Sequence, residues 1–131
     1  MLVYLDASAI VKLVRREPES RALLAALRSW PERVTSVVSA VEVPRAVRRA
    51  GADARSLRRA DRVLDRLGLV ELDAPVRARA AALEPAVLRT LDAIHIATAL
   101  ELAPDVETLI TYDRRQARSA RSAGLAVIAP A

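Results

Sequence analysis

Short apolar segments alternate with longer amphipathic segments along this chain. Residues 2–5 form an apolar run that ends at Asp6, and further short runs at 34–38, 69–72, 106–111 and 125–128 also predict strands. Between these runs, apolar residues recur every three or four positions, as they do in an amphipathic helix. The predicted helices cover residues 9–14, 18–30, 41–51, 53–67, 75–83, 91–102 and 113–123.

The alternation of strands and helices predicts an α/β fold. Short, continuously apolar strands are typical of parallel sheets covered on both faces, so we expect a three-layer α/β/α domain with a central, mainly parallel, five-stranded sheet. At 131 residues the chain is expected to form a single domain over 1–131. Gly68 and Gly124 are predicted to end helices, whereas Pro44 predicts a kink or a late start in the third helix.

The composition excludes several classes of protein. The chain has no cysteine, which rules out disulfides, thiolate metal sites and a cysteine nucleophile. No uncharged apolar run approaches the ~18 residues of a membrane span, and no basic segment opens a signal peptide. We therefore expect a cytoplasmic protein with no membrane association. The three glycines are far apart in the sequence, so neither a dinucleotide fingerprint nor a P-loop is present.

Arginine dominates the charge. The chain has 21 basic and 16 acidic residues, a formal net charge of +5, and Lys12 is its only lysine. This bias favours a polyanionic partner, because the guanidinium fork suits phosphate, although a GC-rich genome produces the same bias on any surface. Tyr4, Trp30 and Tyr112 are the only aromatic residues, which argues against a sheet that stacks successive bases.

Carboxylates stand where open parallel sheets bind their ligands. Asp6 ends the first predicted strand and Asp113 follows the fourth, while Glu42 and Asp92 lie early in predicted helices. Ligands of such sheets bind at the carboxyl ends of the strands, so we expect these four side chains to converge there. Asp6 is the hardest to explain as a helix cap, because it closes a strand and has no predicted helix of its own to start.

In its motifs the chain resembles the PIN-domain ribonucleases, and among them the VapC-type toxins of type II toxin–antitoxin pairs. The resemblance extends over nearly the whole chain. It is carried by Tyr4-Leu5-Asp6-Ala7-Ser8-Ala9, by Ser39-Ala40-Val41-Glu42, by Leu91-Asp92-Ala93-Ile94-His95-Ile96-Ala97-Thr98-Ala99, and by Leu109-Ile110-Thr111-Tyr112-Asp113 before a basic helix. The chain departs from the family pattern at Ala7, where many relatives carry another small polar residue, and at Pro44, just past Glu42.

The resemblance implies a metal-dependent endoribonuclease. In such proteins the matching acidic residues bind Mg²⁺ or Mn²⁺ and a metal-activated water cleaves RNA, so these roles pass to Asp6, Glu42, Asp92 and Asp113. Ser8 and Thr111 match supporting hydroxyls of the site. The chemistry agrees, because hard divalent cations take oxygen ligands and four neighbouring carboxylates repel one another unless a cation neutralises them.

The resemblance also implies partners, namely a cognate VapB-like antitoxin and a second copy of the chain in a homodimer. The antitoxin segment is expected in an apolar groove beside the first helices, lined by Ile10, Val14, Leu23, Leu24 and Leu27. Arg114 and Arg115 adjoin Asp113, so they are the candidates for holding an RNA phosphate beside the metals.

Several of these residues also have a purely structural explanation. Asp113 with Gln116 fits a capping box, and so does Ser39 with Glu42. Asp92 can favour a helix N-terminus after a Thr90 cap, and Ser8 can be a cap alone. His95, the only histidine, is expected to be buried or to support the site from behind rather than to act as a general base.

Two alternative functions follow from these structural explanations. A catalytically silent RNA- or partner-binding module on the same fold would keep the basic surface and use the carboxylates only as caps, and metal dependence separates it from the enzyme. A phosphotransfer domain would also place aspartates at strand ends. It is disfavoured, since Asp6-Ala7-Ser8 supplies neither an acidic pair nor a nucleophile spaced for it.

Overall fold

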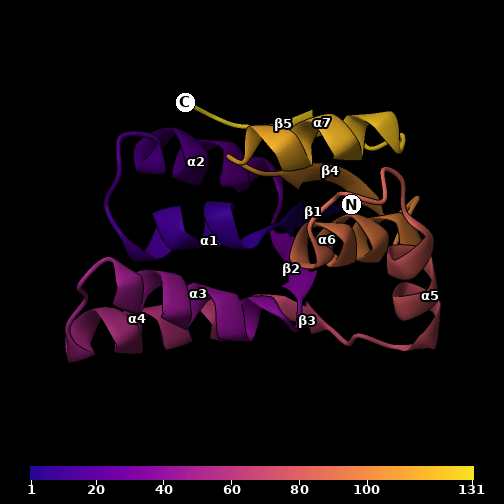
Figure 1. Ribbon diagram of the computed structural model, residues 1–131. Coiled ribbons are helices and arrows are strands. Elements are labelled where there is room, and N and C mark those ends of the chain that lie inside the picture. The colour runs from indigo at the N-terminus through magenta and orange to yellow at the C-terminus, as the bar shows by residue number, and fades with distance from the viewer.

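The computed structural model describes residues 1–131 and contains one five-stranded sheet at its centre. The strands are β1 (Leu2–Leu5), β2 (Glu32–Ser36), β3 (Gly68–Val70), β4 (Val106–Ile110) and β5 (Val127–Ile128). They are all parallel and lie in the order β3-β2-β1-β4-β5. Helices cover both faces of the sheet, so the predicted three-layer α/β/α class is confirmed (Figure 1).

The helices divide into two groups that follow each other in the sequence. The first group is α1 (Ala7–Val14), α2 (Ser20–Ala26) with the short 3-10 helix η1 (Leu27–Ser29), α3 (Ser39–Arg49) and α4 (Ala54–Asp65). The second is α5 (Ala74–Ala82), α6 (Thr90–Glu101) and α7 (Arg114–Ser122). In Figure 1 the first group occupies the left of the molecule and the second lies to the right and above.

The side-chain alternation of β1 assigns each group to its face. Val3 and Leu5 point into a cluster that contains buried residues of α1, α2, α3 and α4. Tyr4, between them, points the opposite way into a cluster with Ile96 of α6 and Ala120 of α7. The central strand is therefore apolar at every buried position because both of its faces are covered, which is the usual pattern in a parallel sheet.

Several element boundaries differ from the predicted ones. The strand predicted at 34–38 occupies Glu32–Ser36. Backbone pairing with Leu2, Val3 and Tyr4 sets its bounds, and its run of valines does not. The expected late start of the third helix is wrong, because α3 begins at Ser39 and includes Pro44. Gly68 does not end a helix but opens β3, where a Cβ would lie 3.2 Å from a Val34 methyl carbon. Gly124 ends α7 with a positive φ of 100°, as predicted.

The strand order fixes where a ligand can approach. From β1 the chain proceeds outward to β2 and β3, and then crosses back to β4 and β5 on the other side of β1. The strands stay parallel, but the order in which they are added to the sheet reverses between β1 and β4. The connection after β1 therefore leads to one side of the sheet, and the connection after β4 leads to the other. Such a switch point leaves a crevice in doubly wound sheets. None of the helices is long and apolar enough to cross a membrane.

Candidate functional site

A pocket of about 260 Å³ opens at the carboxyl ends of β1 and β4. All four predicted acidic residues line it, Asp6 directly after β1, Asp113 shortly after β4, Glu42 from α3 and Asp92 from α6. The pocket walls also include Ser8, Arg89, His95 and Gln116. The expected convergence of the four carboxylates on one pocket is therefore observed, although no three of the acidic or histidine side chains already form a compact cation-binding group.

Asp6 is the most buried of the four acidic residues, and hydrogen-bond donors contact both of its carboxylate oxygens. It is 2% exposed. One carboxylate oxygen accepts from the Ser8 hydroxyl at 2.6 Å and from the Ala9 N–H at 3.0 Å, and the other accepts from the Thr111 hydroxyl at 2.5 Å. Burial raises the pKa of Asp6, and these hydrogen bonds and the nearby His95 oppose that rise.

The expectation that Asp6 starts no helix is wrong. α1 begins at Ala7, two residues earlier than predicted, and Asp6 is its N-cap. Ser8 therefore lies inside the helix, where its hydroxyl donates to Asp6 and accepts the Tyr112 N–H at 2.9 Å. Ser8 thus ties the first turn of α1 to the segment after β4, which supports the predicted auxiliary role of both hydroxyl residues, Ser8 and Thr111.

Asp113 is the N-cap of α7, as its structural explanation predicts. Its carboxylate accepts from the Arg115 and Gln116 N–H groups at 2.9 and 3.2 Å. The reciprocal half of the capping box does not form, because the Gln116 side chain turns into the pocket instead. The other suggested caps are wrong: Val38 and Arg89 occupy the N-cap positions of α3 and α6, with no side-chain cap bond.

Gln116 is a site residue that the sequence did not reveal. It is 2% exposed, and its amide nitrogen faces the carboxylates, donating to Asp6 at 2.8 Å and to Asp92 at 3.2 Å. The opposite amide orientation would set a carbonyl oxygen against two carboxylates. Only its position one turn after Asp113 on α7 could have indicated this role, and that spacing pointed equally well to a cap.

Three of the four acidic residues of the pocket, Asp6, Asp92 and Asp113, form no ion pair. No Lys or Arg nitrogen lies within 4.0 Å of the carboxylates of Asp6, Asp92 or Asp113. The pKa of Asp92 is raised, first by burial and then by repulsion from Asp113 and Asp6, while Arg89 acts in the opposite direction. A set of oxygen donors with excess negative charge fits a hard divalent cation. Arg89, at the pocket wall, is the second site residue that sequence reasoning missed.

Glu42 reaches the pocket from a separate helix and has one hydrogen-bond partner. Its Oε1 lies 2.6 Å from Nε2 of His95, which is 1% exposed. Nδ1 of the same ring lies 2.7 Å from the Tyr4 hydroxyl. His95 is therefore buried, as predicted, and its ring lies between Glu42 and Tyr4.

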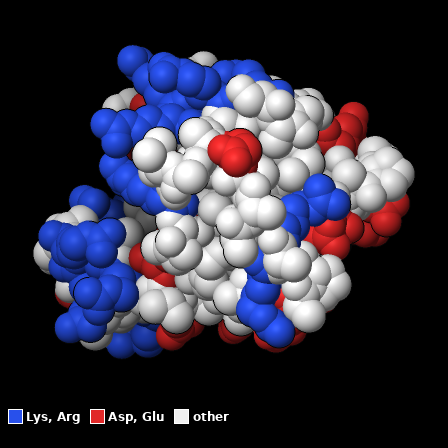
Figure 2. Space-filling view, turned by 45° about the vertical axis from the view of Figure 1, so that its right-hand side comes forward, with Lys and Arg blue, Asp and Glu red and all other residues white.

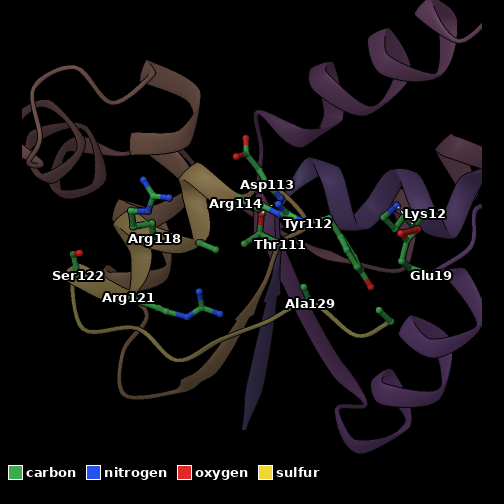
Figure 3. Close-up of a pocket in the computed structure, with 12 residues that line it drawn as sticks. Lys12, Glu19, Thr111, Tyr112, Asp113, Arg114, Arg118, Arg121, Ser122 and Ala129 are labelled. Carbon is green, nitrogen blue, oxygen red and sulfur yellow. Dashed lines mark hydrogen bonds and ion pairs between the residues drawn. The ribbon is translucent and has the colours of Figure 1, made fainter.

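A second, larger pocket of about 750 Å³ adjoins the acidic one, and the two share Asp113. Figure 3 shows Arg114, Arg118 and Arg121 of α7 on one side of this basic groove, and Lys12 and Glu19 on the other. Lys12 is paired with Glu19 at 2.9 Å and lies over the Tyr112 ring, so the free positive charge is on the α7 side. Arg114 lines this groove but not the acidic pocket, and Arg115 lines neither.

The expected apolar groove beside the first helices is only partly exposed. Ile10, Val14, Leu23 and Leu27 are core residues no more than 5% exposed, so their assignment to a docking groove is wrong. Leu24 is 56% exposed and lines a pocket of about 300 Å³ with Leu13, Val63 and Leu67. Four arginines surround these apolar side chains: Arg33, Arg59, Arg62 and Arg66.

Comparisons with known proteins agree with this geometry. The PIN domain family model matches residues 3–122. The chain is 49% identical over 128 residues to Ribonuclease VapC46 of Mycobacterium tuberculosis, covering 98% of this chain and 97% of that protein. It is 42% identical over 134 residues to Ribonuclease VapC35 of the same species, with the same coverage. Its fold is similar to that of VapBC2 from Rickettsia felis, with a TM-score of 0.77 and 16% identity over the whole of both chains.

We predict that Asp6→Asn stabilises the metal-free protein at neutral pH. The folded-state pKa of Asp6 is raised, so between the unfolded and folded pKa values the folded state holds a proton that the unfolded chain has lost. The free energy of unfolding therefore falls as the pH rises through that window. Asparagine removes the buried charge and remains a good N-cap. In EDTA, thermal denaturation should give a melting temperature a few degrees higher for Asp6→Asn at about pH 7, with the difference shrinking toward about pH 4.

The matched control for this measurement is Asp61→Asn, because Asp61 is exposed on α4. Its melting temperature should stay close to that of the unmodified chain at both pH values. An Asp6→Asn protein that is less stable at neutral pH would mean that hydrogen bonds to the Asp6 carboxylate outweigh the cost of burying its charge.

Proposed function

The chain belongs to the PIN-domain family, among the VapC-type ribonuclease toxins, and we propose that its acidic pocket hydrolyses RNA with the help of Mg²⁺ or Mn²⁺. The single observation that carries this proposal is the convergence of Asp6, Glu42, Asp92 and Asp113 on one pocket at the switch point of the sheet. Because family members are ribonucleases, the substrate class follows from membership, and the pocket supplies the place where the chemistry occurs.

The four carboxylates are the residues that would hold the cation. Their donor atoms are all oxygen, and no basic side chain forms an ion pair with Asp6, Asp92 or Asp113. Burial raises the pKa of Asp6 and of Asp92, and repulsion from the two other aspartates adds to the rise at Asp92. A bound cation would polarise the scissile phosphate and lower the pKa of the attacking water.

The remaining residues of the pocket position these carboxylates. Three donors orient both oxygens of Asp6: the hydroxyls of Ser8 and Thr111 and the Ala9 N–H. The Asp6 carboxylate therefore needs little rearrangement during the reaction. Gln116 donates to both Asp6 and Asp92, so it holds these two carboxylates side by side. Arg89 stands at the wall of the pocket, where it can bind a phosphate oxygen of the substrate.

The RNA strand is proposed to run from the acidic pocket into the basic groove along α7. The two pockets share Asp113, and Arg114 and Arg118 stand one helical turn apart on the groove wall. For Arg115, the other arginine suggested by the sequence, we propose no position inside this path. In Figure 2 Lys and Arg side chains gather at the height of α2 and α7, and a second gathering lies at the height of α3 and α4.

A VapB-like antitoxin is the proposed protein partner. The pocket around Leu24 combines an apolar base with a rim of arginines, so it suits a peptide that carries both apolar and acidic side chains. In its crystal structure VapBC2 from Rickettsia felis, a protein of similar fold, is bound to a DNA fragment from its promoter. A homodimer in the cytoplasm is part of the same proposal, as expected for toxins of this family.

We predict that RNA cleavage requires the divalent cation and the acidic residues. Outer partners of metal ligands already contribute about 10- to 100-fold, so Asp6→Asn and Asp92→Asn should each lower the cleavage rate at least ~100-fold. A labelled RNA pool incubated with Mg²⁺ or Mn²⁺, and separately with EDTA, gives the measurement, with 5′-phosphate ends expected on the products. Asp61→Asn, on the exposed face of α4, should cleave at the unmodified rate.

The outcomes of this experiment separate the enzyme from the silent binding module. If the unmodified chain and the Asp6 and Asp92 variants degrade RNA alike, the activity comes from a contaminant. If pure protein binds RNA and leaves it intact with either cation, the acidic pocket does not catalyse hydrolysis and the binding-module alternative replaces the enzyme.

Replacing Arg114 and Arg118 by glutamine should weaken RNA binding and its salt dependence. Each lost phosphate contact lowers the slope of log affinity against log salt by about 0.7 for a single strand, so the double variant should lose about 1.4. Binding is measured in EDTA by fluorescence anisotropy at several salt concentrations. Arg28→Gln is the control, since exposed Arg28 lies near Trp30, which contacts Glu107 at the opposite, amino end of the strands. Equal slopes for all three proteins would remove α7 from the RNA path.

Leu24→Glu should abolish or strongly reduce capture of the antitoxin, because the new carboxylate would repel the acidic side chains proposed for the antitoxin peptide. The fold should stay intact, because Leu24 is on the surface. The test co-expresses the chain with the product of a short reading frame immediately upstream and measures complex formation. Val87→Glu, at a residue 90% exposed in the loop before α6, is the control and should leave the complex unchanged. A Leu24→Glu chain that binds as tightly as the unmodified chain would place the antitoxin elsewhere.

A further inference from the structure

A chain of three buried or half-buried side chains leads from the sheet into the acidic pocket. It begins at Tyr4 in the middle of β1, which is 0% exposed, continues through His95 of α6, and ends at Glu42 of α3. The tyrosine and histidine rings meet edge to face, with centroids 5.7 Å apart and planes at 74°. None of the steps described so far uses Tyr4 or His95.

The hydrogen bonds of this chain engage both ring nitrogens of His95. The Tyr4 oxygen accepts the Ser36 N–H at 3.0 Å and lies 2.7 Å from Nδ1 of His95. Nε2 of the same ring lies 2.6 Å from Oε1 of Glu42, and because a carboxylate oxygen accepts, Nε2 donates in this bond. Both ring nitrogens are engaged, so His95 is not itself available as a ligand or a general base.

Glu42 needs such a partner more than the other acidic residues do. Asp6 and Asp113 are short side chains fixed by backbone N–H groups at the helices they cap. Glu42 has an additional rotatable bond, remains 20% exposed, and forms no hydrogen bond except the one to His95. Without that bond its carboxylate would be free to turn toward solvent.

We propose that Tyr4 and His95 are positioning residues that hold Oε1 of Glu42 and so present Oε2 to a divalent cation in the pocket. The proposal rests on the metal-dependent function proposed above, and it adds the two residues that orient Glu42, the fourth carboxylate of the ligand set. The backbone of β2, through Ser36, is the fixed point from which the geometry of Glu42 is set.

Two measurements on the full chain test this assignment without RNA. Because His95 is the only histidine, the imidazole ¹⁵N spectrum of the protein reports this ring alone. The spectrum should show one ring form with a proton on Nε2, the nitrogen that faces Glu42. A ring with no proton on Nε2, or a proton that exchanges between the two nitrogens, would overturn the proposal, and this measurement needs no variant.

The second measurement is Mn²⁺ affinity, followed by calorimetry or by the EPR signal of free Mn²⁺. Tyr4→Phe keeps the ring and removes only the hydroxyl, so Mn²⁺ should bind about 10-fold more weakly, as is typical when an outer partner of a ligand is lost. The Nδ1 signal of His95 should also shift in Tyr4→Phe, because that nitrogen loses its hydrogen-bond partner. Tyr112→Phe is the matched control, since the Tyr112 hydroxyl donates to the Pro130 carbonyl, and it should change neither measurement.

The outcomes separate this proposal from the one on which it rests. If the unmodified chain fails to bind Mn²⁺, the metal-dependent function falls and the positioning role falls with it. If the unmodified chain binds Mn²⁺ and Tyr4→Phe, shown to be folded by its melting curve, binds it equally well, only the positioning role is overturned.

Discussion

The burial of Asp6 without a basic partner is the constraint on which the rest of the site depends. A carboxylate in that position is tolerated only if hydrogen-bond donors surround it, and the chain supplies them from four places: Ser8, the Ala9 N–H, Thr111 and Gln116. These donors come from α1, the end of β4 and α7. Satisfying one buried charge therefore fixes how two helices sit on the carboxyl edge of the sheet.

The separation of charge follows from the same arrangement. Four of the 16 acidic residues and one of the 21 basic ones, Arg89, line one pocket, which leaves 12 acidic residues against 20 basic ones on the rest of the molecule. A net charge of +5 is thus the sum of an acidic pocket and a strongly basic exterior. Long-range attraction brings a polyanion to the molecule, but the pocket itself repels phosphate until a cation is present. Binding and reaction therefore depend on different charges.

The sequence predicted the layers of the fold and the four acidic residues, because both depend on local patterns. Apolar runs mark the strands, and Asp6 and Asp113 stand next to strands whose carboxyl ends meet in any parallel sheet. It could not predict Gln116 or Arg89, whose roles depend on the angles at which α7 and α6 reach the pocket. The Tyr4–His95–Glu42 chain joins residues 91 and 53 positions apart, a contact that no local pattern encodes. The misplaced ends of β2 have a similar cause, since pairing with β1 decided them.

The double role of Asp6 and Asp113 limits how this chain can change over time. Each starts a helix and also faces the pocket, so alanine at either position would remove a cap, at a cost of about 1 kcal/mol, together with the charge. Asparagine or serine would remove the charge and keep the cap. A lineage that abandoned catalysis but kept the folded chain would therefore be expected to drift to asparagine or serine at these two positions. No such preference applies to Asp92, which caps nothing.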